Sequence, residues 1–346
     1  MKTGLLSSIQ RKYITPFICI MILFTGVTSY AQQKPGKLLG YVIIPDIVQT
    51  LGMMEKIAAV VDPVRFKPGA LKGQMGAMLG DPKFENIDRT KPMVLMIFQQ
   101  SPVNKAAGSS RENISFAVFF PAKDKARYKK VFDGMSMSSI VKNNMLIVSN
   151  KMPAVTDALK ETDLYVKITA QKLKNDIRLL LKIDNVMSIY SKEIAGLTTI
   201  LQSMEDQQSQ DIEQKKQMAQ FIALGKLFVY GMMDMADQSK DYQLDISLSE
   251  KNILFSSEHS AKPGTPLGSF YDGTAPGVNK CLALLPEKGD LTYAGYFDMK
   301  RFKDFLSSTV TGALKRDSSL SKDLDMNLIE EYKKFLDLYT GEFAFI

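Results

Sequence analysis

The residue types that most often carry out chemistry are scarce in this chain. His259 is the only histidine, and the only cysteines are Cys19 and Cys281. A serine hydrolase needs a serine positioned beside its histidine, and no Gly-x-Ser-x-Gly turn occurs. A structural zinc site needs four ligands, which one histidine and one cysteine cannot supply. The sequence therefore assigns no catalytic residue and no metal ligand, and it predicts that His259 is a surface or loop histidine at the end of a strand.

Cys281 and the methionines are also interpreted as packing residues and not as sites of chemistry. Cys281 opens the apolar run Cys281-Leu-Ala-Leu-Leu285, which favours a small buried core residue over an intermolecular bridge or a reactive thiol. Methionine is abundant, with 20 residues, and Gly231-Met-Met-Asp-Met235 could offer thioethers to copper. Methionine also fills irregular cores and adaptable binding surfaces. We favour a core or contact surface, and we predict no cofactor.

Four glycines recur at helical spacing between Pro68 and Pro82. They are Gly69, Gly73, Gly76 and Gly80. The Lys-Ser/Thr pair of a phosphate-binding loop is absent. In a helix these glycines would form a bare face for close packing, and a mobile flap is the alternative.

The first 31 residues have the composition of an export signal. Lys2, Arg11 and Lys12 precede the apolar stretch Ile14–Val27, which is too short for a stable membrane span. Small residues at Ser29 and Ala31 predict cleavage before Gln32, with an uncleaved anchor as the alternative. We expect an exported protein, periplasmic or extracellular, whose mature chain has no transmembrane span.

The charge of the chain argues against a nucleic-acid surface. The formal net charge is +7, and removal of the three basic residues of the signal leaves +4. The basic residues alternate with acidic ones, as in Lys123-Asp124-Lys125, whereas a nucleic-acid surface needs a concentrated basic stripe. The sequence therefore predicts no nucleic-acid partner.

A long helical pattern occupies residues 183–229. Apolar residues recur at steps of four and three: Ile183, Met187, Tyr190, Ile194, Leu197, Leu201, Met204, then Met218, Ile222, Gly225 and Val229. This spacing is typical of one helix face packing on a partner. Polar residues replace the pattern between Glu205 and Gln217. Two geometries fit, one long helix whose middle is solvated or a helical hairpin that turns near Asp206–Asp211.

The rest of the chain predicts an α+β fold on antiparallel sheets. After the signal at 1–31, residues 32–162 form a first module with strands at 38–44, 93–98, 114–120 and 145–149. Asp46 caps a helix over 47–61, and further helices cover 125–135 and 153–161. The order β-α-β-β-α-β matches the split, ferredoxin-like motif. Residues 163–277 add a strand at 164–169, the long helical segment, and an antiparallel strand pair at 242–248 and 253–259.

The end of the chain repeats its beginning. Residues 278–346 open a second, incomplete module, in which Asp298 caps a helix as Asp46 does and strand 342–346 corresponds to strand 93–98. Residues 165–182 are interpreted as a third, weaker copy of the strand–helix start. An apolar strand at a chain end predicts truncation of a longer protein, or self-association through 342–346.

Short motifs accompany these repeats. Gly80-Asp81-Pro82 precedes the second strand, and Pro263-Gly264-Thr265-Pro266-Leu267-Gly268 follows the strand pair. In these the chain resembles an uncharacterised family of exported bacterial envelope proteins. The resemblance implies envelope location and repeated α+β modules, and it supplies no catalytic residue.

Taken together, these features predict a non-catalytic envelope protein with a binding or scaffolding role, whose partner is an envelope protein or an apolar ligand. The alternative is a carrier with an apolar, lipid-like ligand in a groove lined by methionine and phenylalanine. A hydrolase that uses two carboxylates alone also stays open, because sequence does not show their spatial pairing.

Overall fold

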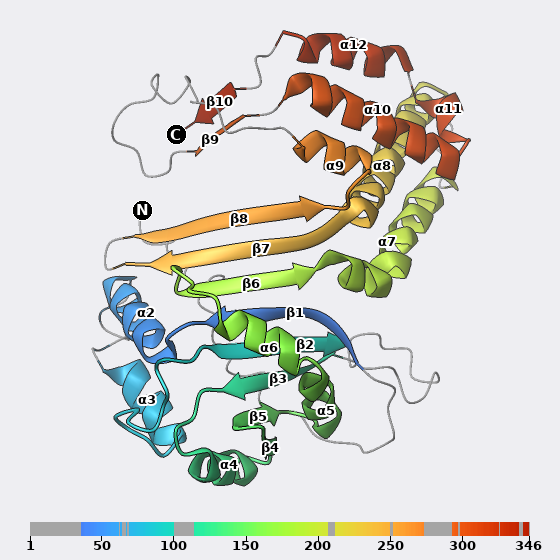
Figure 1. Cartoon of the computed structure of the whole chain (residues 1–346). Helices are drawn as coiled ribbons and strands as arrows, with labels where there is room; N and C mark the ends of the chain where they lie inside the picture. The colour runs from blue at the N-terminus through green and yellow to red at the C-terminus, as the bar shows by residue number, and fades with distance from the viewer. Residues whose placement is uncertain are drawn as a thin grey trace. The chain divides into compact units, whose positions relative to one another are not determined.

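The computed structural model (Figure 1) describes the chain from Gly36 onward, apart from several segments. The described residues are 36–61, 63, 67, 69–99, 114–206, 212–249, 252–272, 293–296, 298–324, 326–338 and 342–345. They fall into two compact units. The first comprises Met1–Leu181 with Gln243–Glu258, and the second Lys182–Tyr242 with His259–Ile346.

The first unit is built on an eight-stranded sheet with the order β4-β5-β3-β2-β1-β6-β7-β8. The strands are β1 Lys37–Ile44, β2 Met93–Gln99, β3 Ile114–Phe120, β4 Ser138–Lys142, β5 Met145–Ser149, β6 Ile177–Lys182, β7 Ser239–Leu248 and β8 Ile253–Ala261. From β4 to β6 each neighbouring pair is antiparallel. Asn143 and Asn144 adopt positive φ between β4 and β5, which is the backbone of a two-residue hairpin turn.

Helices cover both faces of this sheet. They are α2 Ile47–Val61, α3 Ala70–Met78, α4 Lys125–Gly134, α5 Met152–Lys160 and α6 Thr162–Thr169. Along β3, Ala117 and Phe119 belong to the core cluster that includes α5 and α6, whereas Phe116, Val118 and Phe120 belong to the cluster with α2, α3 and α4. Side chains alternate between faces along a strand, so the two clusters are the two sides of one sheet.

The second unit is mainly helical. Its helices are α7 Ile183–Asp206, α8 Ile212–Gln238, α9 Pro266–Tyr271, α10 Met299–Arg316, α11 Leu320–Asp323 and α12 Met326–Leu336, and its short strands are β9 Tyr293–Tyr296 and β10 Glu342–Phe345. A small core of Ala223, Ala313, Leu320 and Leu324 joins α8 to α10 and α11. The Asp298 side chain caps α10 by accepting from the Arg301 backbone N–H, as Asp46 does for Val48 at the start of α2.

The α+β class and the antiparallel sheet are confirmed, but the repeated ferredoxin-like modules are not. In a split βαβ motif another strand lies between the first and second strands, whereas β1 pairs directly with β2, and antiparallel to it. The strand predicted at 164–169 is wrong, because residues 162–169 form α6. The helix predicted at the end of 165–182 is also wrong, since residues 177–182 form β6. Strand β10 pairs with β9, so its apolar residues have a partner within the second unit.

The glycine-rich segment is partly the helix that its spacing predicts. Helix α3 contains Gly73 and Gly76, while Gly69 precedes it and Gly80 follows it with positive φ. A Cβ on Gly76 would lie 2.7 Å from the Cα of Pro82, whereas a Cβ on Gly73 would meet nothing within 4 Å. Close packing therefore explains Gly76 and not Gly73.

We expect opposite effects from alanine at these two glycines of one helix. Gly76→Ala should lower the free energy of unfolding by about 2 kcal/mol, because backbone atoms have to move. Gly73→Ala should raise it by about 0.5–1 kcal/mol, since alanine is the better helix former. Urea unfolding of both variants checks this, and changes of the same sign would contradict the packing assigned to Gly76.

Candidate binding face on the α7–α8 hairpin

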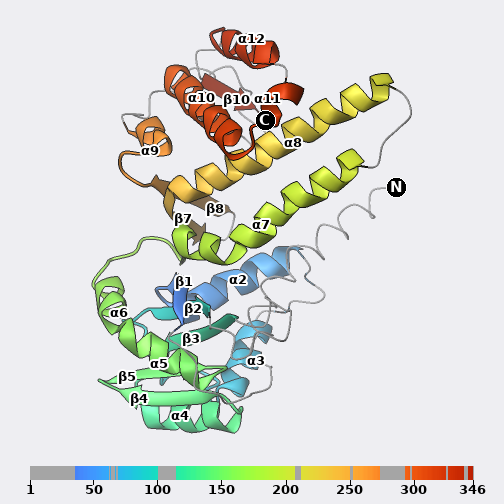
Figure 2. The ribbon, with the colours of Figure 1, turned by 90° about the vertical axis from the view of Figure 1, so that its right-hand side faces the viewer.

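Helices α7 and α8 form an antiparallel hairpin. Figure 2 shows the two helices side by side, and the connecting residues 207–211 lie outside the described part of the chain. The structure thus selects the hairpin over the single long helix. The Leu201 side chain lies 3.3 Å from the position that a Cβ on Gly225 would take, so glycine here permits close approach of the helices. Ile222 and Val229 are buried on the same side of α8.

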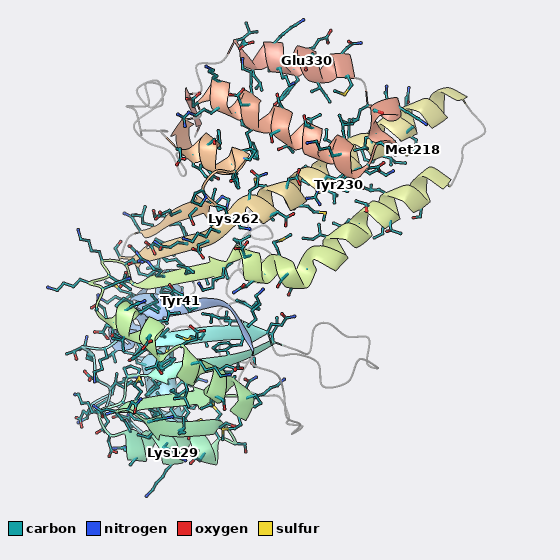
Figure 3. All side chains as sticks on the ribbon, turned by 45° about the vertical axis from the view of Figure 1, so that its right-hand side comes forward. Tyr41, Lys129, Met218, Tyr230, Lys262 and Glu330 are labelled. Atoms are coloured by element: carbon teal, nitrogen blue, oxygen red, sulfur yellow. The ribbon has the colours of Figure 1, made fainter. Side chains whose placement is uncertain are left out.

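A second side of α8 packs on α10 and α11. Ala223 is buried there, and Tyr230, which Figure 3 labels together with Met218, packs against the same cluster. Lys226 and Asp234 of α8 point this way. The Lys226 Nζ lies 3.7 Å from a carboxylate oxygen of Asp317, and Arg316 on α10 donates to Asp234 at 2.6 Å. Two of the three sides of α8 are therefore packed.

The third side of α8 is apolar and exposed. It carries Phe221, Leu224, Phe228, Met232 and Met235, whose exposed fractions run from 39% for Met235 to 68% for Phe228. At about 100° per residue these five positions fall within an arc of roughly 80°. This arc lies beside the α7 contact and opposite the α10 contact. Together the five side chains form one continuous stripe.

Helix α7 carries a matching stripe. Tyr190, Leu197 and Ile200 are exposed at 40%, 45% and 59%. Leu201 and Gly225 mark the sides on which α7 and α8 touch each other. Viewed along each helix from its N-terminus, the exposed residues of α7 are rotated away from Leu201 in the same sense as the α8 stripe is rotated away from Gly225. In an antiparallel pair, equal displacement places both stripes on the same side, as the equivalent flanking positions of an antiparallel coiled coil face each other. We call these eight residues the apolar face; they are Tyr190, Leu197, Ile200, Phe221, Leu224, Phe228, Met232 and Met235.

The sequence pattern allowed the hairpin as one of two geometries, and it did not identify this face. The seam predicted Tyr190, Leu197 and Met218 to be buried, and their exposed fractions of 40–46% correct that assignment. The seam residues Ile222, Gly225 and Val229 do lie between helices. The missed signal is that α8 carries two apolar stripes instead of one, which indicates two apolar contacts. Within Gly231–Met235, Met232 and Met235 belong to the face, consistent with a contact surface.

His259 is held by hydrogen bonds on both ring nitrogens. Its Nδ1 lies 2.8 Å from the Tyr271 hydroxyl and its Nε2 lies 2.7 Å from the Ser239 hydroxyl. Ser239 donates its own proton to the Met235 carbonyl at 2.6 Å, so it accepts from Nε2–H. Burial lowers the pKa of His259, which favours the neutral ring. Since Ser239 is buried and its proton points away from the imidazole, the group fastens β8 to the end of α8 and to α9 and is not arranged as a nucleophile.

Other chemistry-bearing groups also hold structure together. Asp81 is buried and accepts from the Tyr128 hydroxyl and from the backbone N–H groups of Glu85 and Asn86. Arg178 of β6 makes a two-pronged ion pair with Asp245 of β7 at 2.7 and 2.8 Å. Among the described residues no three His, Cys, Asp or Glu side chains gather as metal ligands would. Cys281 lies outside those residues.

A second exposed apolar set lies on β8, where Ile253, Leu254 and Phe255 are 44–65% exposed. It is shorter than the apolar face and comprises three consecutive residues on an edge strand. None of the helices described here has the length and apolarity needed to cross a membrane. Comparison of the chain with family models, with curated proteins and with solved structures finds no match, so the geometry above is the basis for a functional proposal.

Proposed function

We propose that this protein is a non-catalytic, exported envelope protein that binds a partner through the apolar face of the α7–α8 hairpin. The observation that carries the proposal is the exposure of eight large apolar side chains on one side of two packed helices. Contiguous exposed patches of this kind mark interaction sites, because leaving them in water is unfavourable.

The surroundings of the face support a binding role. Between Phe221 and Met235, the charged residues Lys226 and Asp234 belong to the α10 side, so the stripe itself is uncharged. The fully buried centres of protein interfaces are similarly depleted of charge and enriched in aromatic residues and methionine. Helix α8, which carries five of the eight side chains, is fixed from behind by α10 and α11, so this part of the face is held in shape before a partner arrives.

Export is part of the proposal and rests on residues 1–31. The basic start, the apolar stretch and the small residues before Gln32 support cleavage there. We also infer that the chain contains recurring strand–helix–helix–strand units. The orders β1-α2-α3-β2 and β6-α7-α8-β7 support this, and the order β9-α10-α11-α12-β10 near the end differs from them by one additional short helix.

A carrier of an apolar ligand is the second candidate. It is favoured by the composition of the face, in which Phe221, Phe228, Met232 and Met235 make up half of the side chains. Methionine adapts to irregular apolar surfaces, which suits an apolar ligand as well as a protein side chain. Native mass spectrometry of the purified protein distinguishes this role, because a carrier should retain lipid of defined mass.

Site-specific photo-crosslinking in living cells tests the binding role. A photoreactive phenylalanine analogue at position 228 or 221 should give a discrete covalent adduct, since both side chains point outward from a face that a partner covers. The matched control is position 338, where Leu338 is 79% exposed but lies outside the face. Adducts at 228 and 221 but not at 338 support the proposal. Equal labelling of all three positions, or none at 228 and 221, overturns it.

A further inference from the structure

We propose that the partner of the apolar face is a second copy of this chain, so that two α7–α8 hairpins pack face to face about a twofold axis. This inference rests on the binding role proposed above and names its partner. Every protomer would contribute the same eight side chains, which makes the contact isologous.

The size of the face fits a dimer interface. A large apolar side chain has about 200 Å² of surface, so eight that are about half exposed leave roughly 800 Å² open. The most exposed are Phe228 at 68% and Phe221 at 62%. A standard interface buries about 800 Å² on each partner, whereas the largest apolar patch on a typical monomer is only about 300–600 Å². The face is therefore large enough for a stable partner of its own kind.

The chemistry of the α8 stripe is self-complementary. Like charges would meet across a twofold axis and repel, and the α8 stripe carries none. With the axis perpendicular to the helices, the two α8 helices run antiparallel. The stripe from Phe221 to Met235 then meets its own copy reversed, so Phe228 at its centre lies against Phe228 of the other protomer and Phe221 lies near Met235. With α7 included, each protomer adds two helices to a four-helix contact of the kind that bundles use.

A membrane surface is the less favoured occupant. Helices that lie in a membrane interface carry Lys and Arg along the border of the apolar side. From Phe221 to Met235 the single basic residue is Lys226, which is 5% exposed and paired with Asp317. The described part of α8 around the stripe thus lacks the basic border that anionic lipid would attract.

Sedimentation equilibrium of the chain from Gln32 onward tests the inference. Wild type should show twice the chain mass at micromolar concentration. Phe228→Lys and Phe221→Lys should each weaken the association at least about 30-fold, as expected for a central aromatic contact. Leu338→Lys is the matched control and should leave the association unchanged. Thermal unfolding of each variant, measured under conditions where all are monomeric, verifies that the fold is retained.

The outcomes separate this inference from the proposed function. A monomeric wild type at 100 µM overturns the second copy as partner, as does a dimer that neither face variant weakens. A photo-adduct at position 228 with twice the chain mass supports both proposals. An adduct of another mass, or lipid retained by a monomer, leaves the face as a binding site but excludes the second copy. If the wild type is monomeric and neither position 228 nor position 221 gives an adduct, both the proposed binding role and the second copy as partner are overturned.

Discussion

Ile222→Asp is expected to lower the free energy of unfolding by about 4 kcal/mol, because it places a carboxylate without a partner between two helices. Ile222 is 1% exposed and sits on the side of α8 that faces α7. The removed side chain also leaves a volume that the neighbouring side chains fill only in part. Urea denaturation monitored by circular dichroism measures the change.

Leu197→Asp is the matched control within the same hairpin. Leu197 is 45% exposed and belongs to the apolar face, so its carboxylate reaches water and the expected loss in the isolated chain is below about 1 kcal/mol. If the two variants unfold at the same urea concentration, Leu197 is buried in solution. In that case the apolar face is covered by another part of the chain.

Local patterns predicted the central strands well. Residues 93–98 and 114–120 are short, nearly continuous apolar runs, and β2 and β3 occupy these positions with both faces of the sheet covered by helices. Strand β7 alternates polar and apolar residues over 242–248, and both β7 and β8 were predicted. A strand that is buried on both faces of a sheet needs a continuous apolar run, so the burial of β2 and β3 can be predicted from their own residues.

The pattern failed where tertiary contacts decide between helix and strand. Residues 164–169 contain Val166 and Ile168, which favour a strand, but Tyr165 and Ile168 are spaced to bury on one side of α6 while Val166 is 55% exposed. Residues 179–181 are three leucines, which suit a helix, yet they form β6 because β1 offers an open strand partner. No local propensity contains that information.

The apolar face could not be placed from the sequence for a similar reason. Periodicity showed that α7 and α8 carry apolar residues at helical spacing, but it does not state how many sides of a helix are covered. The seam at Ile222 and Val229 is buried, whereas the stripe at Phe221 and Phe228 is exposed. Only the positions of α10 and α11 show which stripe is left open.

Asp81→Asn is expected to lower the free energy of unfolding by about 2–3 kcal/mol at pH 7, with the loss disappearing in acid. Asp81 is 4% exposed and accepts three hydrogen bonds, from the Tyr128 hydroxyl at 2.7 Å and from the backbone N–H groups of Asn86 at 2.9 Å and Glu85 at 3.1 Å. An amide has only one acceptor oxygen and places an NH₂ group against one of these donors.

The pH dependence follows from the pKa of Asp81. Burial by itself raises this pKa. The hydrogen bonds from Tyr128, Asn86 and Glu85, together with the nearby Arg127, lower the pKa by more than burial raises it, so the pKa in the folded state lies below the usual 3.8. The carboxylate therefore stabilises the fold above pH 3.8, and this contribution is lost as the pH falls below 3.8 through the folded-state value. At lower pH, wild type approaches the neutral asparagine variant.

Urea unfolding of wild type and Asp81→Asn between pH 7 and pH 2.5 measures this difference, which should shrink steadily below pH 4. Tyr128→Phe is the control, since it removes one of the three donors and should cost about 1 kcal/mol at pH 7. A wild-type advantage that stays constant down to pH 2.5 would show that the pKa of Asp81 is the same in the folded and unfolded protein. Gly80-Asp81-Pro82 would then owe its place before β2 to backbone shape and not to the charge of the carboxylate.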